Sequence, residues 1–273
     1  MKYKCLSIAG FDGSGGAGIQ ADLKTFSALG CYGMTVLTAL PVQNTCGVRN
    51  CYGISLKAIE DQLEAIFDDI VPDSIKIGML FSEDIVELVA KFLEKHAAEI
   101  PIVLDPVMVA KSGDSLLLPG AVSALKKKLI GLATVITPNL PEACALVGDI
   151  QDPIALGEKL LKLGPNAVLL KGGHGKGATS EDLFLNQQGD REWLRTKRIH
   201  SKNTHGTGCT LSSAICALLA QDVPLFEACE GAKRYLFGAI LASKDNSVGH
   251  GHGPVHHFYQ LWPNLKKESG SKS

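Results

Sequence analysis

Short apolar runs alternate along the chain with segments whose apolar residues recur at helical spacing. The runs are rich in Val, Ile and Leu and lack polar alternation, which is typical of strands that are covered on both faces. We predict such strands at residues 5–9, 35–42, 74–78, 102–104, 134–137 and 167–171.

The segments between these strands predict amphipathic helices. One stripe consists of Ile59, Leu63, Ile66, Phe67 and Ile70, and another of Ile85, Leu88, Val89, Phe92 and Leu93. Pro119 and Pro141 open two further helices, because proline is tolerated in a first helical turn. After residue 199 the apolar spacing predicts two more helices, at 208–220 and 225–243.

Repeated strand–helix units predict an α/β fold with a mainly parallel sheet. Segments 181–186 and 191–199 flank the polar residues 187–190, a pattern that predicts a β-hairpin at the sheet edge. No linker or repeat divides the chain, so we predict one domain over residues 1–262, followed by a frayed polar tail at 263–273.

Composition narrows the classes of function. The chain has 273 residues, of which 45% are hydrophobic, and its formal net charge is -1. No basic field exists to attract a phosphate backbone, so nucleic acid is not expected as a partner. The apolar runs are shorter than the roughly 18 residues that a membrane span needs, and the N-terminus shows no cleavage-site pattern. We therefore expect a compact cytoplasmic protein.

The eight cysteines show no C-x-x-C spacing, which argues against a zinc site or a redox motif. Several occupy apolar faces, so we interpret all of them except Cys209 as buried free thiols. Four histidines lie within residues 250–257, but the glycines among them predict a loop rather than a helical metal-binding pair.

A glycine-rich segment at residues 10–18 follows the first predicted strand and precedes a helix. Gly13, Gly15 and Gly18 match G-x-G-x-x-G, the fingerprint of a dinucleotide-binding turn. That fingerprint also requires an acidic residue at the end of the second strand, where this chain has Gln43-Asn44. We therefore favour a turn that admits another ligand close to the backbone. No Walker A motif is present in the sequence.

A second glycine-rich segment, Asn203-Thr204-His205-Gly206-Thr207-Gly208-Cys209-Thr210, precedes an apolar helix. Backbone N–H groups at a helix start, with the helix dipole behind them, form an anion site. Cys209 lies in the first turn, where the same field lowers the pKa of a thiol and favours the thiolate.

Three charged residues follow or close predicted strands. Asp105 and Glu142 could hold Mg²⁺ through oxygen and water ligands, although Glu142 could also simply complement a helix dipole. Lys171 precedes two glycines and can reach a polyphosphate. A bound cation and preorganised N–H donors are needed where a phosphoryl group moves. These features together predict nucleotide-dependent phosphoryl transfer.

Residues 9–26 resemble the opening of the bacterial hydroxymethylpyrimidine/phosphomethylpyrimidine kinases. Those enzymes belong to the ribokinase-like superfamily and serve thiamine synthesis. Further blocks match in the same order at 42–45, 76–80, 105–113, 137–143, 171–174, 203–210 and 253–257. The resemblance implies a three-layer ribokinase-like sandwich, with ATP and Mg²⁺ as co-substrate and cofactor. It also implies two successive phosphorylations of 4-amino-5-hydroxymethyl-2-methylpyrimidine, first to the monophosphate and then to the diphosphate.

The matching blocks also imply roles for individual residues. Gln43 would hydrogen-bond the amidine edge of the pyrimidine, since a carboxamide offers one acceptor and two donors. The same pocket would be lined by Gly10, Ala17, Asp22, Met79 and Val107. Gly206, Thr207, Gly208 and Cys209 would form the anion hole, Asp105 and Glu142 would organise Mg²⁺, and Lys171, Asn139 and Glu142 would contact ATP.

Cys209 occupies the position where many superfamily members carry an aspartate as general base, whereas the pyrimidine kinases usually have cysteine. A thiolate could accept the hydroxyl proton in the first step. In the second step the nucleophile is a phosphate, which is ionised without help because its second pKa is about 6. We therefore hypothesise that Cys209 matters more for the first phosphorylation. The sequence departs from its relatives at Phe11, Asp12 and Gly13, at the lip of the pocket.

Other functions remain open from the sequence. Pyridoxal kinase is the nearest alternative, although Gln43 and Ala110 favour the pyrimidine. A non-catalytic nucleotide-binding sensor on the same fold is a second alternative, and a dinucleotide-dependent oxidoreductase is a third. Relatives are commonly dimers, so the resemblance implies a homodimer.

Overall fold

The computed structural model describes residues 2–108, 116–173, 177–246 and 248–262. The predicted tail at 263–273, Ala110 and His174 lie outside these described residues. Within them, no helix combines the length and apolarity needed to cross a bilayer.

The central sheet has eight strands in the order β10-β9-β8-β7-β6-β5-β1-β2. Its strands are β1 (Lys4–Ala9), β2 (Tyr32–Leu37), β5 (Ser74–Ile77), β6 (Ile102–Leu104), β7 (Val135–Ile136), β8 (Ala167–Lys171), β9 (Thr179–Asn186) and β10 (Arg191–Lys197). Strands β8, β7, β6, β5, β1 and β2 run parallel to one another. Strands β9 and β10 form an antiparallel hairpin at the β8 edge. The α/β fold, the mainly parallel sheet and the edge hairpin are confirmed.

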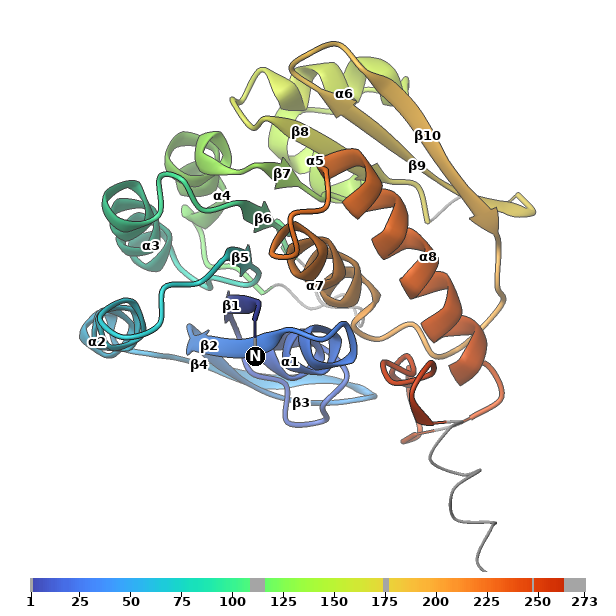
Figure 1. Ribbon diagram of the computed structural model, residues 1–273, viewed down its shortest axis with the longest axis horizontal. Helices are drawn as coiled ribbons and strands as arrows, with labels where there is room; N and C mark the ends of the chain where they lie inside the picture. Colours follow the sequence, from blue (N-terminus) through green and yellow to red (C-terminus); the bar gives the residue numbers. More distant parts are fainter. Residues whose placement is uncertain (1, 109–115, 174–176, 247, 263–273) are drawn as a thin grey trace, which may run out of the picture.

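Helices cover both faces of this sheet (Figure 1). One face carries α2 (Leu56–Phe67), α3 (Glu83–His96), α4 (Ala121–Ala124) with the short turns η1 (Leu125–Leu129) and η2 (Ile130–Leu132), α5 (Leu140–Val147) and α6 (Pro153–Leu161). The other face carries α1 (Gly18–Ala28), α7 (Thr207–Leu219) and α8 (Leu225–Ser243). This is the three-layer arrangement that the resemblance implies.

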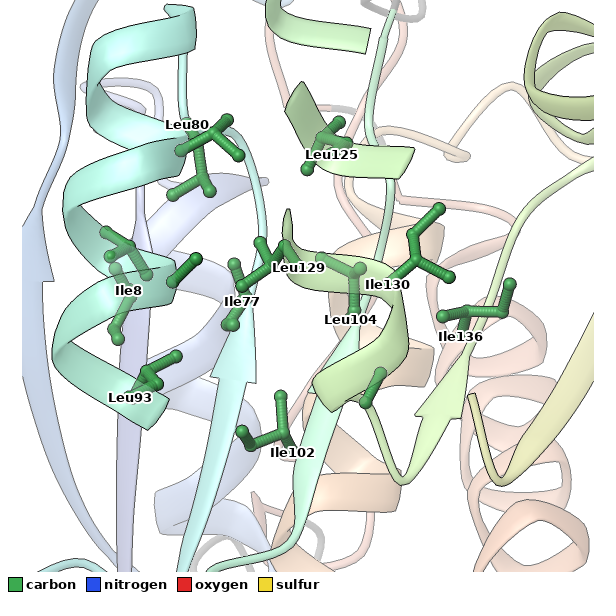
Figure 2. Close-up of a cluster of buried hydrophobic side chains, with 14 of the residues drawn as sticks. Ile8, Ile77, Leu80, Leu93, Ile102, Leu104, Leu125, Leu129, Ile130 and Ile136 are labelled. Atoms are coloured by element: carbon green, nitrogen blue, oxygen red, sulfur yellow. The ribbon is translucent and has the colours of Figure 1, made fainter. Parts of the chain in front are cut away.

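Each face buries its own apolar cluster. Figure 2 shows part of the larger one, in which Ile8, Ile77 and Leu104 of neighbouring strands meet Leu93 of α3 and Leu129 of η1. The smaller cluster packs strand residues such as Val103 and Leu169 against α7 and α8. Successive residues of one strand, Val103 and Leu104, thus belong to opposite clusters, which explains why these runs carry no polar alternation.

One predicted strand is wrong. Residues 35–42 are divided between β2, in the main sheet, and β3 (Ala39–Asn44), which pairs with β4 (Gly47–Gly53) in a separate two-stranded sheet. Thr38 lies at the break, where its hydroxyl donates a hydrogen bond to the Met79 carbonyl at 2.6 Å. The continuous apolar pattern hides this break, because β3 carries apolar residues on both sides although Leu40 and Val42 are exposed.

The eight cysteines, all within the described part of the chain, are free thiols. Cys5, Cys31, Cys216 and Cys229 are buried, as predicted. The prediction is wrong for Cys46, which is exposed in the turn between β3 and β4, and Cys51 and Cys144 are only partly buried.

Candidate active site

The parallel strands bring several predicted site residues to one edge of the sheet. Gly10 follows β1, Met79 lies just beyond β5, Asp105 follows β6, and Lys171 ends β8. Ligands in open α/β folds bind outside these carboxyl ends. Asn139, after β7, forms a parallel bridge with Lys171, which places the two side by side.

Lys171 lies between two buried carboxylates. Its Nζ is 2.9 Å from Asp105 Oδ1 and 3.9 Å from Glu142 Oε2. Asp105 is 1% exposed and Glu142 8%. Burial lowers the pKa of Lys171, but Asp105 and Glu142 outweigh this, so its pKa lies above the ordinary value and the side chain is an ammonium.

Asn139 and Glu142 form a capping box at the start of α5. The Asn139 side chain accepts a hydrogen bond from the Glu142 amide at 2.9 Å, and Glu142 Oε2 accepts one from the Asn139 amide at 2.8 Å. The structural role considered for Glu142 is therefore real. Burial raises the pKa of Glu142, Lys171 opposes this, and the Asp105 charge raises it further.

The start of α7 faces this cluster. Among the described residues, no side chain caps its N-terminus, and the N-cap Gly206 has a left-handed backbone with φ of 76°. A Cβ on Gly208 would lie 3.2 Å from Asp105 Oδ2 and 3.5 Å from Lys171 Nζ. The first-turn amides of α7 therefore adjoin a carboxylate and an ammonium, as a site for a phosphoryl group requires.

The expectation of a thiolate at Cys209 is wrong for this structure. Burial raises the pKa of the thiol to about 11; Lys76 opposes the shift, and Asp22 and Asp105 add to it. At neutral pH Cys209 is therefore a thiol. The helix start alone predicts the opposite, because the sequence does not reveal how much protein surrounds the sulfur.

The glycine-rich loop at residues 10–18 is organised by Asp12, a residue to which the sequence assigned no role. The fully buried Asp12 carboxylate accepts hydrogen bonds from the amides of Ser14, Gly16 and Ala17. His205 Nε2 lies 2.8 Å from its Oδ2. Asp12 therefore joins this loop to the turn that precedes α7. Its position three residues after the end of β1, among glycines, is the signal that could have identified it.

The pKa of Asp12 predicts an acid-sensitive contribution to stability. Burial raises this pKa, but hydrogen bonds from His205 and Ser14 lower it to about 2, from 3.8. A lowered folded-state pKa stabilises the fold above about pH 4, by about 2 kcal/mol, and this contribution disappears as the pH falls toward 2. In urea unfolding, the difference in free energy between wild type and Asp12→Asn should shrink between pH 5 and pH 3. A constant difference would contradict this account.

Gln43 lies on β3 beside the glycine-rich loop. The register of the β3–β4 pair shifts between Val42 and Gln43, and Gln43 Nε2 donates to the Phe11 carbonyl at 3.3 Å. Gly10, the first residue of the loop, lies against Met79: a Cβ on Gly10 would come 3.1 Å from Met79 Sδ. The structure therefore brings Gln43, Gly10 and Met79 around one loop.

Ala17 and Val107 are partly buried and lie on the flanks of this region. The Ala17 amide donates to Asp12 Oδ2 at 2.7 Å, and the Val107 amide donates to the Asp105 carbonyl at 2.8 Å. Their predicted contacts with the substrate remain predictions.

Asp22 differs from the other predicted pocket residues, because its carboxylate is fully buried in the protein. It accepts hydrogen bonds from Ser7 Oγ at 2.6 Å and Ser213 Oγ at 2.7 Å, and it pairs with Lys76 Nζ at 2.8 Å. Both members of the ion pair are 0% exposed. Asp22 therefore faces these partners rather than an open surface.

Residues 12–256 match the family model described as phosphomethylpyrimidine kinase. The chain belongs to the phosphomethylpyrimidine kinase family. It is 48% identical over 267 residues to the hydroxymethylpyrimidine/phosphomethylpyrimidine kinase of Salmonella typhimurium, covering 96% of this chain and all of the relative.

Solved structures agree with this family and its fold. An ADP complex of Bacillus subtilis pyridoxal kinase superposes with a TM-score of 0.87 at 38% identity, covering 96% of this chain and 100% of that one. The phosphomethylpyrimidine kinase of Clostridium difficile 630 gives a TM-score of 0.77 at 44% identity, covering 88% and 100%. The ribokinase-like expectation is thereby confirmed, and the protein is a kinase of this family.

Proposed function

We propose that this kinase uses ATP to phosphorylate 4-amino-5-hydroxymethyl-2-methylpyrimidine to its monophosphate and then to its diphosphate. The observation that carries the proposal is the meeting of Lys171, Asp105 and the uncapped start of α7 at one sheet edge. The same edge holds the loop that Gln43 contacts. Similarity to kinases named for this pyrimidine supports the choice of substrate.

Each part of the site has a role in this proposal. Gln43 selects the aminated ring, which Gly10, Ala17, Met79 and Val107 flank. The amides of Gly206, Thr207, Gly208 and Cys209 hold the transferring phosphoryl group, while Lys171 and Asn139 contact the phosphates of ATP. Asp22 supports this pocket through its buried hydrogen bonds to Ser7 and Ser213 rather than by contact with the ring.

The carboxylates at the site fit a magnesium ion. Asp105 and Glu142 offer oxygen ligands that share one cationic partner, Lys171. Among the described residues, no group of three or more His, Cys, Asp or Glu side chains could hold a metal alone. Mg²⁺ commonly binds through one or two carboxylates together with phosphates and water. When bound here, it would neutralise charge on the triphosphate.

The proposal is tested by supplying ATP, Mg²⁺ and hydroxymethylpyrimidine and identifying the products by mass. We expect the monophosphate first and the diphosphate later, with release of ADP at each step. Nucleotide binding without ADP release would instead indicate a non-catalytic sensor, and formation of the monophosphate alone would contradict the second step.

Pyridoxal phosphorylation is a second candidate, because the Bacillus subtilis pyridoxal kinase superposes so closely. Gln43 favours the aminopyrimidine, since its carboxamide can pair with adjacent donor and acceptor groups. Rates with pyridoxal and hydroxymethylpyrimidine, measured side by side, discriminate the two. A clear preference for pyridoxal would overturn the proposal.

We predict that Cys209→Ala lowers the rate of the first phosphorylation by about 10²-fold or more and leaves the second within a few-fold, because only the alcohol needs a general base. The first-step rate should rise with pH toward the thiol pKa of about 11, since the thiolate fraction increases until then. Each substrate is assayed separately across the pH range. Equal losses in both steps would contradict this role.

We also infer a homodimer. Leu40 and Val42 on β3 and Tyr52 on β4 are exposed by 36%, 45% and 58%, on a hairpin that stands apart from the main sheet. Neighbouring exposed apolar side chains favour protein contacts. Sedimentation of the intact chain at several concentrations tests this, and a monomer at all of them would contradict it.

A further inference from the structure

A fully buried ion pair joins the first turns of α7 to the centre of the sheet. Lys76 of β5 pairs with Asp22 of α1 at 2.8 Å, and neither side chain is exposed. Ser213 of α7 donates to the other oxygen of Asp22 at 2.7 Å. Ser213 lies four residues after Cys209, so the two share one face of the helix.

The ammonium of Lys76 extends toward the active-site end of its strand. Gly78 lies just past β5, and a Cβ there would come 2.8 Å from Lys76 Nζ. Burial lowers the pKa of Lys76, but Asp22, Cys209 and Asp105 outweigh it and raise the pKa above its ordinary value. Lys76 therefore carries a positive charge, and Asp22 and Ser213 connect it to the face of α7 that bears Cys209.

Stability alone does not account for such a pair. Buried ion pairs are expensive to desolvate, and replacing one with apolar residues is often neutral or stabilising. Gly78 also leaves space for the Lys76 ammonium, and a side chain at position 78 would fill that space. Burying this pair therefore costs desolvation free energy. The pair lies at the end of the sheet where charge must change during the reaction.

We propose that Lys76 is the internal counter-ion that supports negative charge on Cys209, and that Asp22 and Ser213 hold it in position. Lys76 is a positioning residue, because it acts through Cys209 rather than on the substrate. The inference rests on the proposed function only for the step in which this charge is used.

In that step, the proton of the substrate hydroxyl passes to the Cys209 sulfur, and the O–H bond breaks as the S–H bond forms. The freed oxygen bonds to the γ-phosphorus while the bond from phosphorus to the ADP oxygen breaks. Lys76 keeps its own proton throughout. The charged groups that act on Cys209 are Lys76 and Lys171, which favour the thiolate, and Asp22 and Asp105, which oppose it.

The test measures the acidity of Cys209 without any substrate. Iodoacetamide alkylation is followed at Cys209 by peptide mass spectrometry from pH 7 to pH 10, in wild type, Lys76→Met and the double variant Asp22→Asn/Lys76→Met. Loss of one neighbouring opposite charge shifts a pKa by about one unit or more, so Lys76→Met should react about tenfold more slowly. The double variant, which also loses the opposing carboxylate, should lie between Lys76→Met and wild type.

A purely structural role predicts the opposite direction. A loosened site would expose the thiol, and alkylation would become faster. Lys57→Met, which removes the exposed Lys57–Asp61 pair on α2, is the matched control and should leave alkylation of Cys209 unchanged. If Lys76→Met does not fold, the double variant decides, because it leaves no unpaired charge.

Alkylation at the wild-type rate, or faster, in the folded variants would overturn the inference. Because this readout needs no pyrimidine, its failure is distinguishable from failure of the proposed function, which the product masses decide. If both the role of Lys76 and the proposed function are correct, Lys76→Met should slow the first phosphorylation more than the second.

Discussion

Lys171→Met is expected to lower kcat for phosphoryl transfer by about 10²- to 10³-fold, the loss typical of removing one preorganised charged or hydrogen-bonding group. Lys171 is the ammonium that lies 2.9 Å from Asp105 and adjoins the start of α7 at Gly208. Methionine keeps the length and apolar stem of the side chain but carries no charge. The rate is measured as ADP release at saturating ATP and pyrimidine.

The same variant should bind Mg²⁺ more tightly than wild type in the absence of nucleotide. Asp105 and Glu142 lose their shared cationic partner, and two buried carboxylates without one repel each other. Thermal melting with and without Mg²⁺ checks this: the ion should raise Tm more in Lys171→Met than in wild type or in the surface control Lys57→Met. A kcat within tenfold of wild type would contradict the role of Lys171.

Gly206→Ala should lower kcat by about 10²-fold, the loss that a displacement of about 1 Å at a reacting centre can cause. Gly206 has φ of 76°, and a Cβ there would collide with the Gly16 carbonyl oxygen. The left-handed conformation alone costs a non-glycine residue about 1–2 kcal/mol. The collision adds to this, because the contact is with backbone and one of the two loops must move away.

Gly189→Ala is the matched control for this variant. Gly189 lies in the turn between β9 and β10 with φ of 94°, and no described atom lies within 4 Å of its added Cβ. Alanine there incurs the backbone strain without the collision. Both variants should lose unfolding free energy in urea, but only Gly206→Ala should lose kcat. Equal kcat losses, or full activity in Gly206→Ala, would show that the Gly16–Gly206 contact does not position the site.

The sequence predicted the layers of the fold and the edge at which the chemistry gathers. Buried parallel strands carry short, continuous apolar runs, and their carboxyl ends must meet at one edge, so Asp105 and Lys171 could be placed together from the sequence. The break at Thr38 could not be predicted. At the break Thr38 donates a hydrogen bond to the Met79 carbonyl, forty-one positions along the chain, and no local pattern reveals such a long-range contact.

The chain by itself determined which residues carry chemistry, because residue type and local backbone preference are local properties. The tertiary structure alone decided their charge states and partners. The first turn of α7 would acidify Cys209, yet the protein packed around the sulfur raises the pKa of the thiol to about 11. Asp22, which its motif predicts to line the pocket, forms a fully buried pair with Lys76. Desolvation and long-range pairing depend on what surrounds a group, and only the folded chain supplies those surroundings.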